Sequence, residues 1–97
     1  MRIIARRTLR QFHDKYPDSK GPLDSWYHEV KKIKWFKPQD IKNKYKNASI
    51  VANNRVVFNI GGNKYRLVVK VDYKASIVLI RFVGTHKEYD KIKAGEI

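Results

Sequence analysis

Apolar residues recur at helical spacing in the first part of the chain. From Ala5 they follow positions i, i+4, i+7 and i+11, which form one face of a helix, and Pro17 ends that helix. The residues of this face are Ala5, Leu9, Phe12 and Tyr16. The short β-branched run before it, Met1 to Ile4, predicts a first strand.

A second apolar stripe predicts another helix. After a turn at 18–21, Pro22 suits the first helical position, and apolar side chains follow at i, i+3, i+4, i+7 and i+10. We interpret this stripe as core rather than as a ligand site; it consists of Leu23, Trp26, Tyr27, Val30 and Ile33. We expect the helix to close near Lys37-Pro38, with a further short helical turn over 38–44.

The second half of the chain has the composition of an antiparallel sheet. Turn residues divide it into four predicted strands, at 49–52, 56–60, 65–73 and 77–85. The fold class predicted for the whole chain is therefore α+β.

The apolar pattern predicts the register of these strands. If Ile60 lies opposite Tyr65, every residue on one side of the first hairpin is apolar, and that side is the predicted core. A two-residue turn at Lys74-Ala75 keeps the same side apolar in the last strand, with Leu67 opposite Phe82.

The other side of the predicted sheet mixes aliphatic and basic side chains, so we do not expect a second closed core there. It carries Asn59, Arg66, Val68, Lys70, Leu79, Arg81 and Val83. Because guanidinium donors match phosphate oxygens two at a time, this open face is a candidate groove for a phosphate backbone. An ordinary solvated sheet face is the alternative.

Composition narrows the class of partner. A chain of 97 residues suits a single domain, 1–97, and its 22 Lys and Arg against 9 Asp and Glu give a formal net charge of +13. This charge favours a polyanionic partner, because counterions released from phosphate backbones drive binding. A membrane surface would also attract the charge, but no stretch approaches the roughly 18 apolar residues of a membrane span. No signal peptide is recognisable, and the absence of cysteine fits a reducing cytosol.

Thr85-His86-Lys87-Glu88 has the form of a capping box, so a helix should start at His86. Its first turn would carry His86 and Lys87, with Tyr89 on the same face as His86. The positive end of the helix should attract a phosphate and keep the imidazole neutral, able to accept a proton. The alternative is that 85–90 simply caps a short surface helix.

These residues suit RNA cleavage. RNA carries its own nucleophile, the 2′-hydroxyl, so cleavage needs a base, an acid and a cationic clamp on the phosphate. His86 and Tyr89 are the candidate proton-transfer groups, while Arg66 and Lys87 are the candidate clamp. We expect no metal or other cofactor.

A basic segment precedes the sheet, where Lys42, Lys44 and Lys46 surround Tyr45. Two interpretations stay open for it, a solvated linker and a loop that contacts phosphates.

Four segments together resemble a known family: Trp26-Tyr27, Trp35-Phe36, Val57 to Leu67, and Thr85 to Asp90. The chain is similar along nearly its whole length to the HigB toxins of bacterial type II toxin-antitoxin systems, which belong to the RelE-like mRNA endonucleases. The resemblance implies a RelE-like fold, with a small, mainly antiparallel sheet, two N-terminal helices packed on one face and a short C-terminal helix.

The resemblance also implies an activity and partners. It implies a cytoplasmic bacterial enzyme that cleaves translated mRNA on the ribosome and leaves a 2′,3′-cyclic phosphate. The implied protein partner is a HigA-like antitoxin with a helix-turn-helix domain. By position, Arg66 matches the strand arginine that clamps the scissile phosphate, and Tyr89 lies near the C-terminal tyrosine used in proton transfer. His86-Lys87 departs from the pattern, so the base and the acid stay unassigned.

The candidate residues fall into two groups. The catalytic candidates are Arg66, His86, Lys87 and Tyr89. The candidates for RNA or ribosome binding are Asn59, Asn63, Lys64, Lys70, Arg81, Lys42, Lys44 and Lys46. The competing hypothesis is a non-catalytic basic module that binds RNA or ribosomes, which the charge fits equally well. A DNA-binding regulator is less well supported because no helix-turn-helix pair is recognisable.

Overall fold

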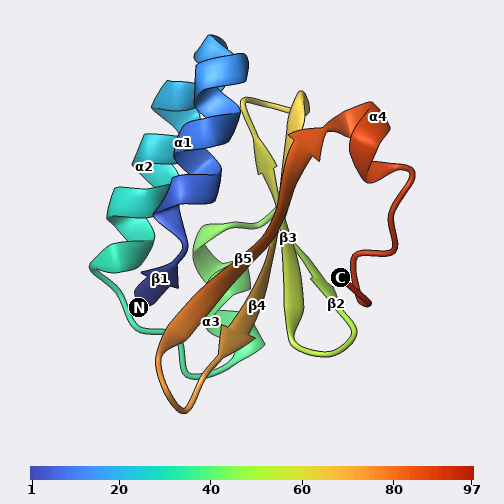
Figure 1. Cartoon of the computed structure of the whole chain (residues 1–97). Helices are drawn as coiled ribbons and strands as arrows, with labels where there is room; N and C mark the ends of the chain where they lie inside the picture. Colours follow the sequence, from blue (N-terminus) through green and yellow to red (C-terminus); the bar gives the residue numbers. More distant parts are fainter.

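A five-stranded sheet in the order β1-β5-β4-β3-β2 organises the protein (Figure 1). The structure is a computed structural model that describes residues 1–97. Strand β1 runs parallel to β5, and all other neighbouring pairs are antiparallel. The strands span Arg2–Ile4 (β1), Ser49–Val51 (β2), Arg55–Ile60 (β3), Tyr65–Asp72 (β4) and Ile77–Thr85 (β5).

Two helices cover one face of this sheet, and a short C-terminal helix lies on the other side (Figure 1). The α-helices span Arg6–Lys15 (α1), Lys20–Lys31 (α2), Pro38–Lys44 (α3) and His86–Tyr89 (α4), and a 3-10 turn η1 spans Pro17–Ser19. The predicted α+β architecture is confirmed, with a mainly antiparallel sheet, two N-terminal helices on one face and a short C-terminal helix. None of the helices has the length and apolar character that crossing a bilayer requires.

The bounds of α2 differ from the prediction at both ends. The helix begins at Lys20, so Pro22 lies at its third position, where an amide proton is not needed for the helical ladder. It ends at Lys31 rather than near Lys37. The amino group of Met1 donates to the carbonyls of Val30 and Ile33, which satisfies acceptors that a longer helix would have used.

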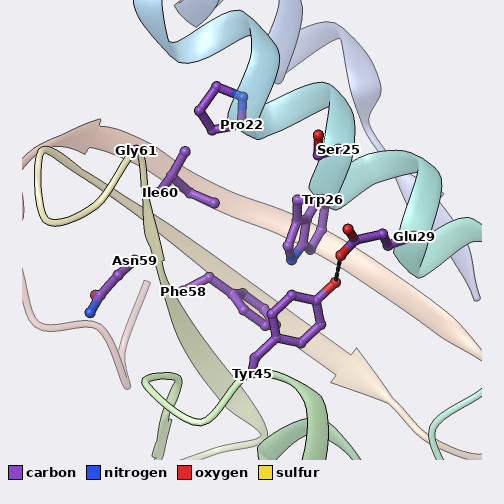
Figure 2. A pocket seen from close by; sticks show the side chains of 9 residues that line it. All are labelled: Pro22, Ser25, Trp26, Glu29, Tyr45, Phe58, Asn59, Ile60 and Gly61. Carbon is purple, nitrogen blue, oxygen red and sulfur yellow. Dashed lines mark hydrogen bonds between the residues drawn. The ribbon is translucent and has the colours of Figure 1, made fainter.

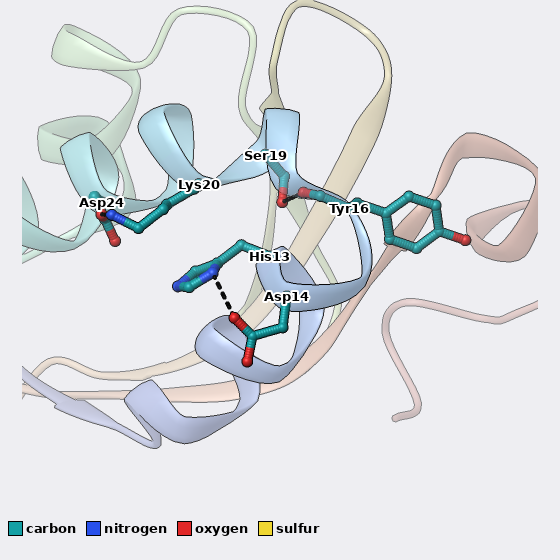
Figure 3. Close-up of polar contacts among 6 residues, drawn as sticks. All are labelled: His13, Asp14, Tyr16, Ser19, Lys20 and Asp24. Carbon is teal, nitrogen blue, oxygen red and sulfur yellow. Dashed lines mark hydrogen bonds and ion pairs between the residues drawn. The ribbon is translucent and has the colours of Figure 1, made fainter.

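Short-range polar contacts lie at the junction between α1 and α2 and within the helix on each side of it (Figure 3). Ser19 is fully buried, and its Oγ donates to the Tyr16 carbonyl at 2.7 Å. His13 Nδ1 lies 3.4 Å from Asp14 Oδ1 on α1, and Lys20 Nζ lies 3.3 Å from Asp24 Oδ2 on α2. Because Ser19 satisfies its hydroxyl locally, the chain can turn here inside the protein.

The main core lies between the helices and the sheet, and Phe58 is at its centre. The Phe58 ring centroid lies 5.4 Å from that of Trp26, 6.1 Å from that of Trp35 and 5.1 Å from that of Tyr45. All but Tyr45 are at least nine-tenths buried. Trp35 follows the end of α2, so ending that helix early lets this ring turn inward.

The predicted hairpin register is confirmed: Ile60 pairs with Tyr65, Phe58 with Leu67, and Asn59 with Arg66. Gly61 and Gly62 form the turn with φ of +63° and +71°, a region that glycine enters without steric cost.

The predicted register of β5 is wrong beyond Ile80. Val69 pairs with Ile80 as expected, but Val68 pairs with Phe82, so Arg81 is an extra residue in a β-bulge. Each side chain after the bulge therefore points to the face opposite the one predicted. Val83 packs against the main core, and Phe82 lies on the other face instead.

The sheet face that points away from α1 and α2, which we call the second face, is not fully open. This corrects the expectation of an open sheet face. Val57 and Val68 on this face are 3% and 0% exposed, although neither belongs to the main core. Beside them, the Arg55 guanidinium donates to the Ile97 carbonyl, and Asn53 Nδ2 donates to the Gly95 carbonyl at 2.8 Å. The C-terminal segment is thus held against the β2–β3 end of this face.

Candidate active site

Arg66 lies on β4 and on the face of the sheet that points away from α1 and α2. Its strand neighbours are Asn59 on β3 and Gly84 on β5. Guanidinium Nη1 donates to the carbonyls of Asn63 at 3.0 Å and Tyr65 at 3.2 Å. The turn therefore orients the guanidinium, while Nε and Nη2 have no protein partner and remain available to an anion.

Tyr89, on α4, lies near Arg66. The Cζ atom of Arg66 lies 6.0 Å from the centroid of the Tyr89 ring, at the outer limit of a cation–π contact. A guanidinium and a phenol that are 23 residues apart in sequence thus face the same space.

The capping box that starts α4 is present. Glu88 N donates to Thr85 Oγ1 at 3.2 Å, and Thr85 N donates to Glu88 Oε1 at 2.8 Å. The hydrogen bond from the Thr85 amide lowers the pKa of Glu88. In addition, His86 N donates to the Lys64 carbonyl at 3.1 Å, which ties the start of α4 to the β3–β4 turn.

These same bonds correct the expected role of the helix end. The amides of His86 and Glu88 are used within the protein, and α4 is only four residues long. Contrary to what the sequence had led us to expect, the amides of His86 and Glu88 are therefore not free to bind a phosphate.

His86 has a partner that the sequence reasoning missed. Its Nδ1 lies 3.1 Å from Asp90 Oδ2, and both side chains are more than half exposed. A carboxylate at Nδ1 favours the tautomer with the proton on that nitrogen, which leaves Nε2 to exchange protons with a substrate. Asp90 also opposes the field of the helix end at this imidazole. The i, i+4 spacing of the two residues was the signal that could have found this pair.

The remaining residues near Arg66 are polar. Asn59 Nδ2 lies 3.4 Å from Asn63 Oδ1, which places both amides beside the arginine. Lys87 is exposed in the first turn of α4 and has no protein partner. The structure thus gathers Arg66, Asn59, Asn63 and the first turn of α4 at one end of the second face.

Other predicted residues lie elsewhere. Lys64 points toward the helices, where Nζ lies 3.0 Å from Asp18 Oδ2. Lys70 is on the second face but four residues further along β4, roughly 13 Å from Arg66. Arg81 is exposed at the bulge and is not in regular register with the others.

The lysines of the α3–β2 connection have different surroundings. Lys42 Nζ donates to the carbonyls of Lys46 at 2.6 Å and Ala48 at 2.7 Å, so it shapes this loop. Lys44 Nζ lies 3.7 Å from Glu29 Oε1, whereas the Lys46 side chain has no protein partner. A cavity of about 310 Å³ connects Lys44 and Lys46 with Asn59 at the edge of β3.

A second cavity, of about 150 Å³, lies on the helix side of the same edge (Figure 2). Trp26, Tyr45 and Phe58 line it, and Tyr45 Oη donates to Glu29 Oε1 at 2.7 Å. The Asn59 side chain points away from this cavity (Figure 2). The cavity contains none of the four catalytic candidates and is separate from the Arg66 site.

Comparison with known proteins identifies similar sequences. Residues 19–92 match the model of the HigB_toxin family, described as the RelE-like toxic component of a toxin-antitoxin system. The chain is 33% identical over 92 residues to the mRNA interferase toxin HigB of Escherichia coli K12, covering 93% of this chain and 88% of that protein. The mRNA interferase HigB of Shigella flexneri gives the same values. Another mRNA interferase HigB, from Escherichia coli O6:H1, is 24% identical over 94 residues.

Proposed function

This chain belongs to the HigB family of RelE-like toxins, and from that premise we propose that it is an endoribonuclease that cleaves mRNA and thereby arrests translation. The observation that carries the proposal is the meeting of Arg66 with the first turn of α4, because it combines a phosphate clamp with two proton-transfer groups. The net charge of +13 supports binding to a polyanion.

The proposed reaction is a transesterification within the RNA. The 2′-oxygen attacks the adjacent phosphorus, the bond from phosphorus to the 5′-oxygen breaks, and the products are a 2′,3′-cyclic phosphate and a 5′-hydroxyl. His86 Nε2 is the better placed base because Asp90 occupies Nδ1. Tyr89 then protonates the leaving 5′-oxygen. The reverse assignment exchanges these two roles.

Charge on the phosphate must be neutralised as the pentacoordinate transition state forms. Arg66 is suited to this task since two of its nitrogens are free and its orientation is set by the Asn63 and Tyr65 carbonyls. Lys87 supplies a second cation from α4. Asn59 and Asn63 are placed to bind sugar or phosphate oxygens beside the arginine.

We further propose that cleavage requires the ribosome and that the toxin acts in the bacterial cytoplasm. The site is an exposed end of a sheet without deep walls, so another surface is needed to hold the mRNA in line for attack. Lys70, Arg81, Lys46 and the exposed arginines of α1 are the proposed contacts to ribosomal RNA. The proposed protein partner is a HigA-like antitoxin with a helix-turn-helix domain.

Cleavage of a translated mRNA by the purified protein tests the proposal. We expect specific 5′-hydroxyl ends with ribosomes present and intact transcript without them. Arg66→Ala and His86→Ala should abolish cleavage and also relieve growth arrest on expression. Lys74→Ala is the matched control, because it removes one cation from the exposed turn between β4 and β5, which has no proposed role in binding or cleavage.

The outcomes separate the competing functions. A wild-type protein that binds ribosomes but leaves every transcript intact is a non-catalytic binding module. If cleavage occurs and survives both substitutions, the function stands and the site is wrong.

A further inference from the structure

The bulge in β5 places an aromatic ring on the second face, which also carries Arg66. Because Arg81 is the extra residue, Phe82 pairs with Val68 instead of Leu67 and leaves the main core. Val68, its partner on this face, is fully buried, while Phe82 itself is only partly buried. A bulge beside a site is a known means of re-aiming a side chain.

Gly84 shows where the Phe82 ring lies. A Cβ atom on Gly84 would come within 2.5 Å of Phe82 Cζ and 3.0 Å of Phe82 Cε2. The tip of the ring therefore occupies the place that a side chain at position 84 would take. Gly84 is the strand partner of Arg66, so this ring tip lies beside the arginine.

A flat apolar ring next to a phosphate clamp suits one kind of ligand group. Proteins hold single-stranded RNA by stacking its unpaired bases on aromatic side chains while cations bind the backbone. In a nucleotide the base and the phosphate are joined through one sugar, so a clamped phosphate brings a base to the neighbouring surface. Phe82 is the aromatic residue of β5 on this face, and its strand partner there, Val68, is fully buried.

We propose that Phe82 forms a stacking subsite for a nucleobase of the mRNA next to the cleaved bond. This inference rests on the proposed ribonuclease function and adds a substrate-binding residue to it. Gly84 serves the subsite by leaving room for the ring. The alternative role of Phe82, covering Val68, requires only an apolar side chain of similar size and no aromatic face.

Two substitutions at the same position separate these roles. Phe82→Leu keeps apolar cover over Val68 and removes the stacking face, whereas Phe82→Tyr keeps both. Stacking is worth about 1–3 kcal/mol per base, so we expect Phe82→Leu to lower kcat/KM for cleavage of translated mRNA by about 5- to 150-fold. Phe82→Tyr should stay within about twofold of the wild type. A thermal melt of each variant establishes that the fold is intact.

Gly84→Ala provides a supporting variant, since its new methyl group would displace the ring without deleting it; because this methyl would also come within 3.2 Å of Glu88 Oε1 in the capping box, the melting temperature of the variant is measured as well. We expect Gly84→Ala to lose cleavage activity to about the same extent as Phe82→Leu. A smaller residue at position 82 should not restore activity to the Gly84→Ala protein, because that double variant also lacks the aromatic ring. Phe82→Met serves in place of Phe82→Leu if the leucine variant does not fold.

A second readout does not depend on catalysis. Ribosome-bound mRNA carrying 2-aminopurine beside the cleavage position is mixed with the His86→Ala protein, and stacking on Phe82 should quench its fluorescence. The quenching should disappear when Phe82→Leu is added to His86→Ala. Equal fluorescence with and without Phe82, or equal cleavage by Phe82→Leu and the wild type, would overturn the subsite. Failure of the wild type to cleave at all would instead overturn the proposed function, and the fluorescence comparison would still decide the subsite.

Discussion

The two faces of the sheet hold their aromatic rings in different ways. On the helix side, Phe58 is 2% exposed and is surrounded by three other aromatic rings. On the second face, Phe82 and Tyr89 are only partly buried, and each lies beside the Arg66 position. Rings on the first face stabilise the fold, whereas rings on the second retain surface that a ligand can cover. Substitutions on the two faces should therefore affect different measurements.

The largest expected effect is on the helix side. Phe58→Ala removes the ring at the centre of the core and leaves a cavity, so we expect the free energy of unfolding to fall by about 3–5 kcal/mol. Denaturant unfolding measures this loss. Phe82→Ala, on the second face, should cost clearly less, because that ring is partly exposed already. Equal losses at the two positions would remove the distinction between the faces.

A slightly smaller effect is expected at Arg66, the proposed phosphate clamp, and it should appear in the cleavage activity but not in stability. Arg66→Lys keeps the charge but loses the planar pair of donors that matches a phosphate. We expect kcat/KM to fall by about 10²–10³-fold, the usual cost of losing one transition-state donor, with the melting temperature nearly unchanged. A large drop in melting temperature would show that the Asn63 and Tyr65 carbonyl contacts, rather than phosphate binding, are the main role of this residue.

Asp90 tests the orientation of the proposed base. Asp90→Asn removes the carboxylate that faces His86 Nδ1, and we expect about tenfold slower cleavage with unchanged mRNA binding. Nitrogen chemical shifts of the imidazole should show a larger population of the other tautomer. Asp90→Glu, which keeps a carboxylate within reach, should recover part of the rate. Unchanged imidazole shifts in Asp90→Asn would contradict this role.

The smallest expected effect is on the pH dependence of stability, and it comes from the contact between η1 and the β3–β4 turn. The Tyr65 hydroxyl donates to Asp18 Oδ1, which lowers the pKa of Asp18 and raises the pKa of Tyr65 to about 12. The stabilisation from Asp18 is present above its unfolded pKa of about 4 and is lost as the pH falls through its lower folded pKa. The stabilisation from Tyr65 is present below pH 10 and is lost as the pH rises through about 12.

Unfolding free energy measured against pH checks this prediction. Tyr65→Phe should flatten the dependence at both ends of the range. Tyr27→Phe is the control, because the Tyr27 hydroxyl has no protein hydrogen bond, and it should keep the wild-type profile. A Tyr65→Phe profile parallel to that of the wild type would show that this bond contributes nothing to the pH dependence.

Local patterns in the sequence were sufficient to predict most of the fold. The spacing of Leu9, Phe12, Leu23 and Trp26 located α1 and α2, and the apolar pairing from Ile60 and Tyr65 located the hairpin. These predictions succeed because each depends on neighbours within a few residues. The early end of α2 was missed; there the carbonyls of Val30 and Ile33 accept from Met1, a residue about 30 positions away, and local spacing contains no signal for such a contact.

The candidate site was predictable only in part, for a similar reason. The capping box and Arg66 each follow from local sequence, and the structure places them together. The amide of His86 is not free as expected, because it binds the Lys64 carbonyl, a contact between distant segments. The position of Phe82 was wrong because an alternating pattern contains no signal for an extra residue when both neighbours of the bulge are apolar.

The extra residue at Arg81 also governs how β5 can be compared with other chains. The strand follows one alternation up to Ile80 and the opposite alternation from Phe82 onward. If an alignment omits one residue at this point, it assigns an aromatic residue to the opposite face of the sheet, even where every other residue matches. Residues of β5 before the bulge therefore have to be counted forward from Ile77, and those after it backward from Thr85. Relatives can be compared at the site only when their residues are matched by the count from Thr85.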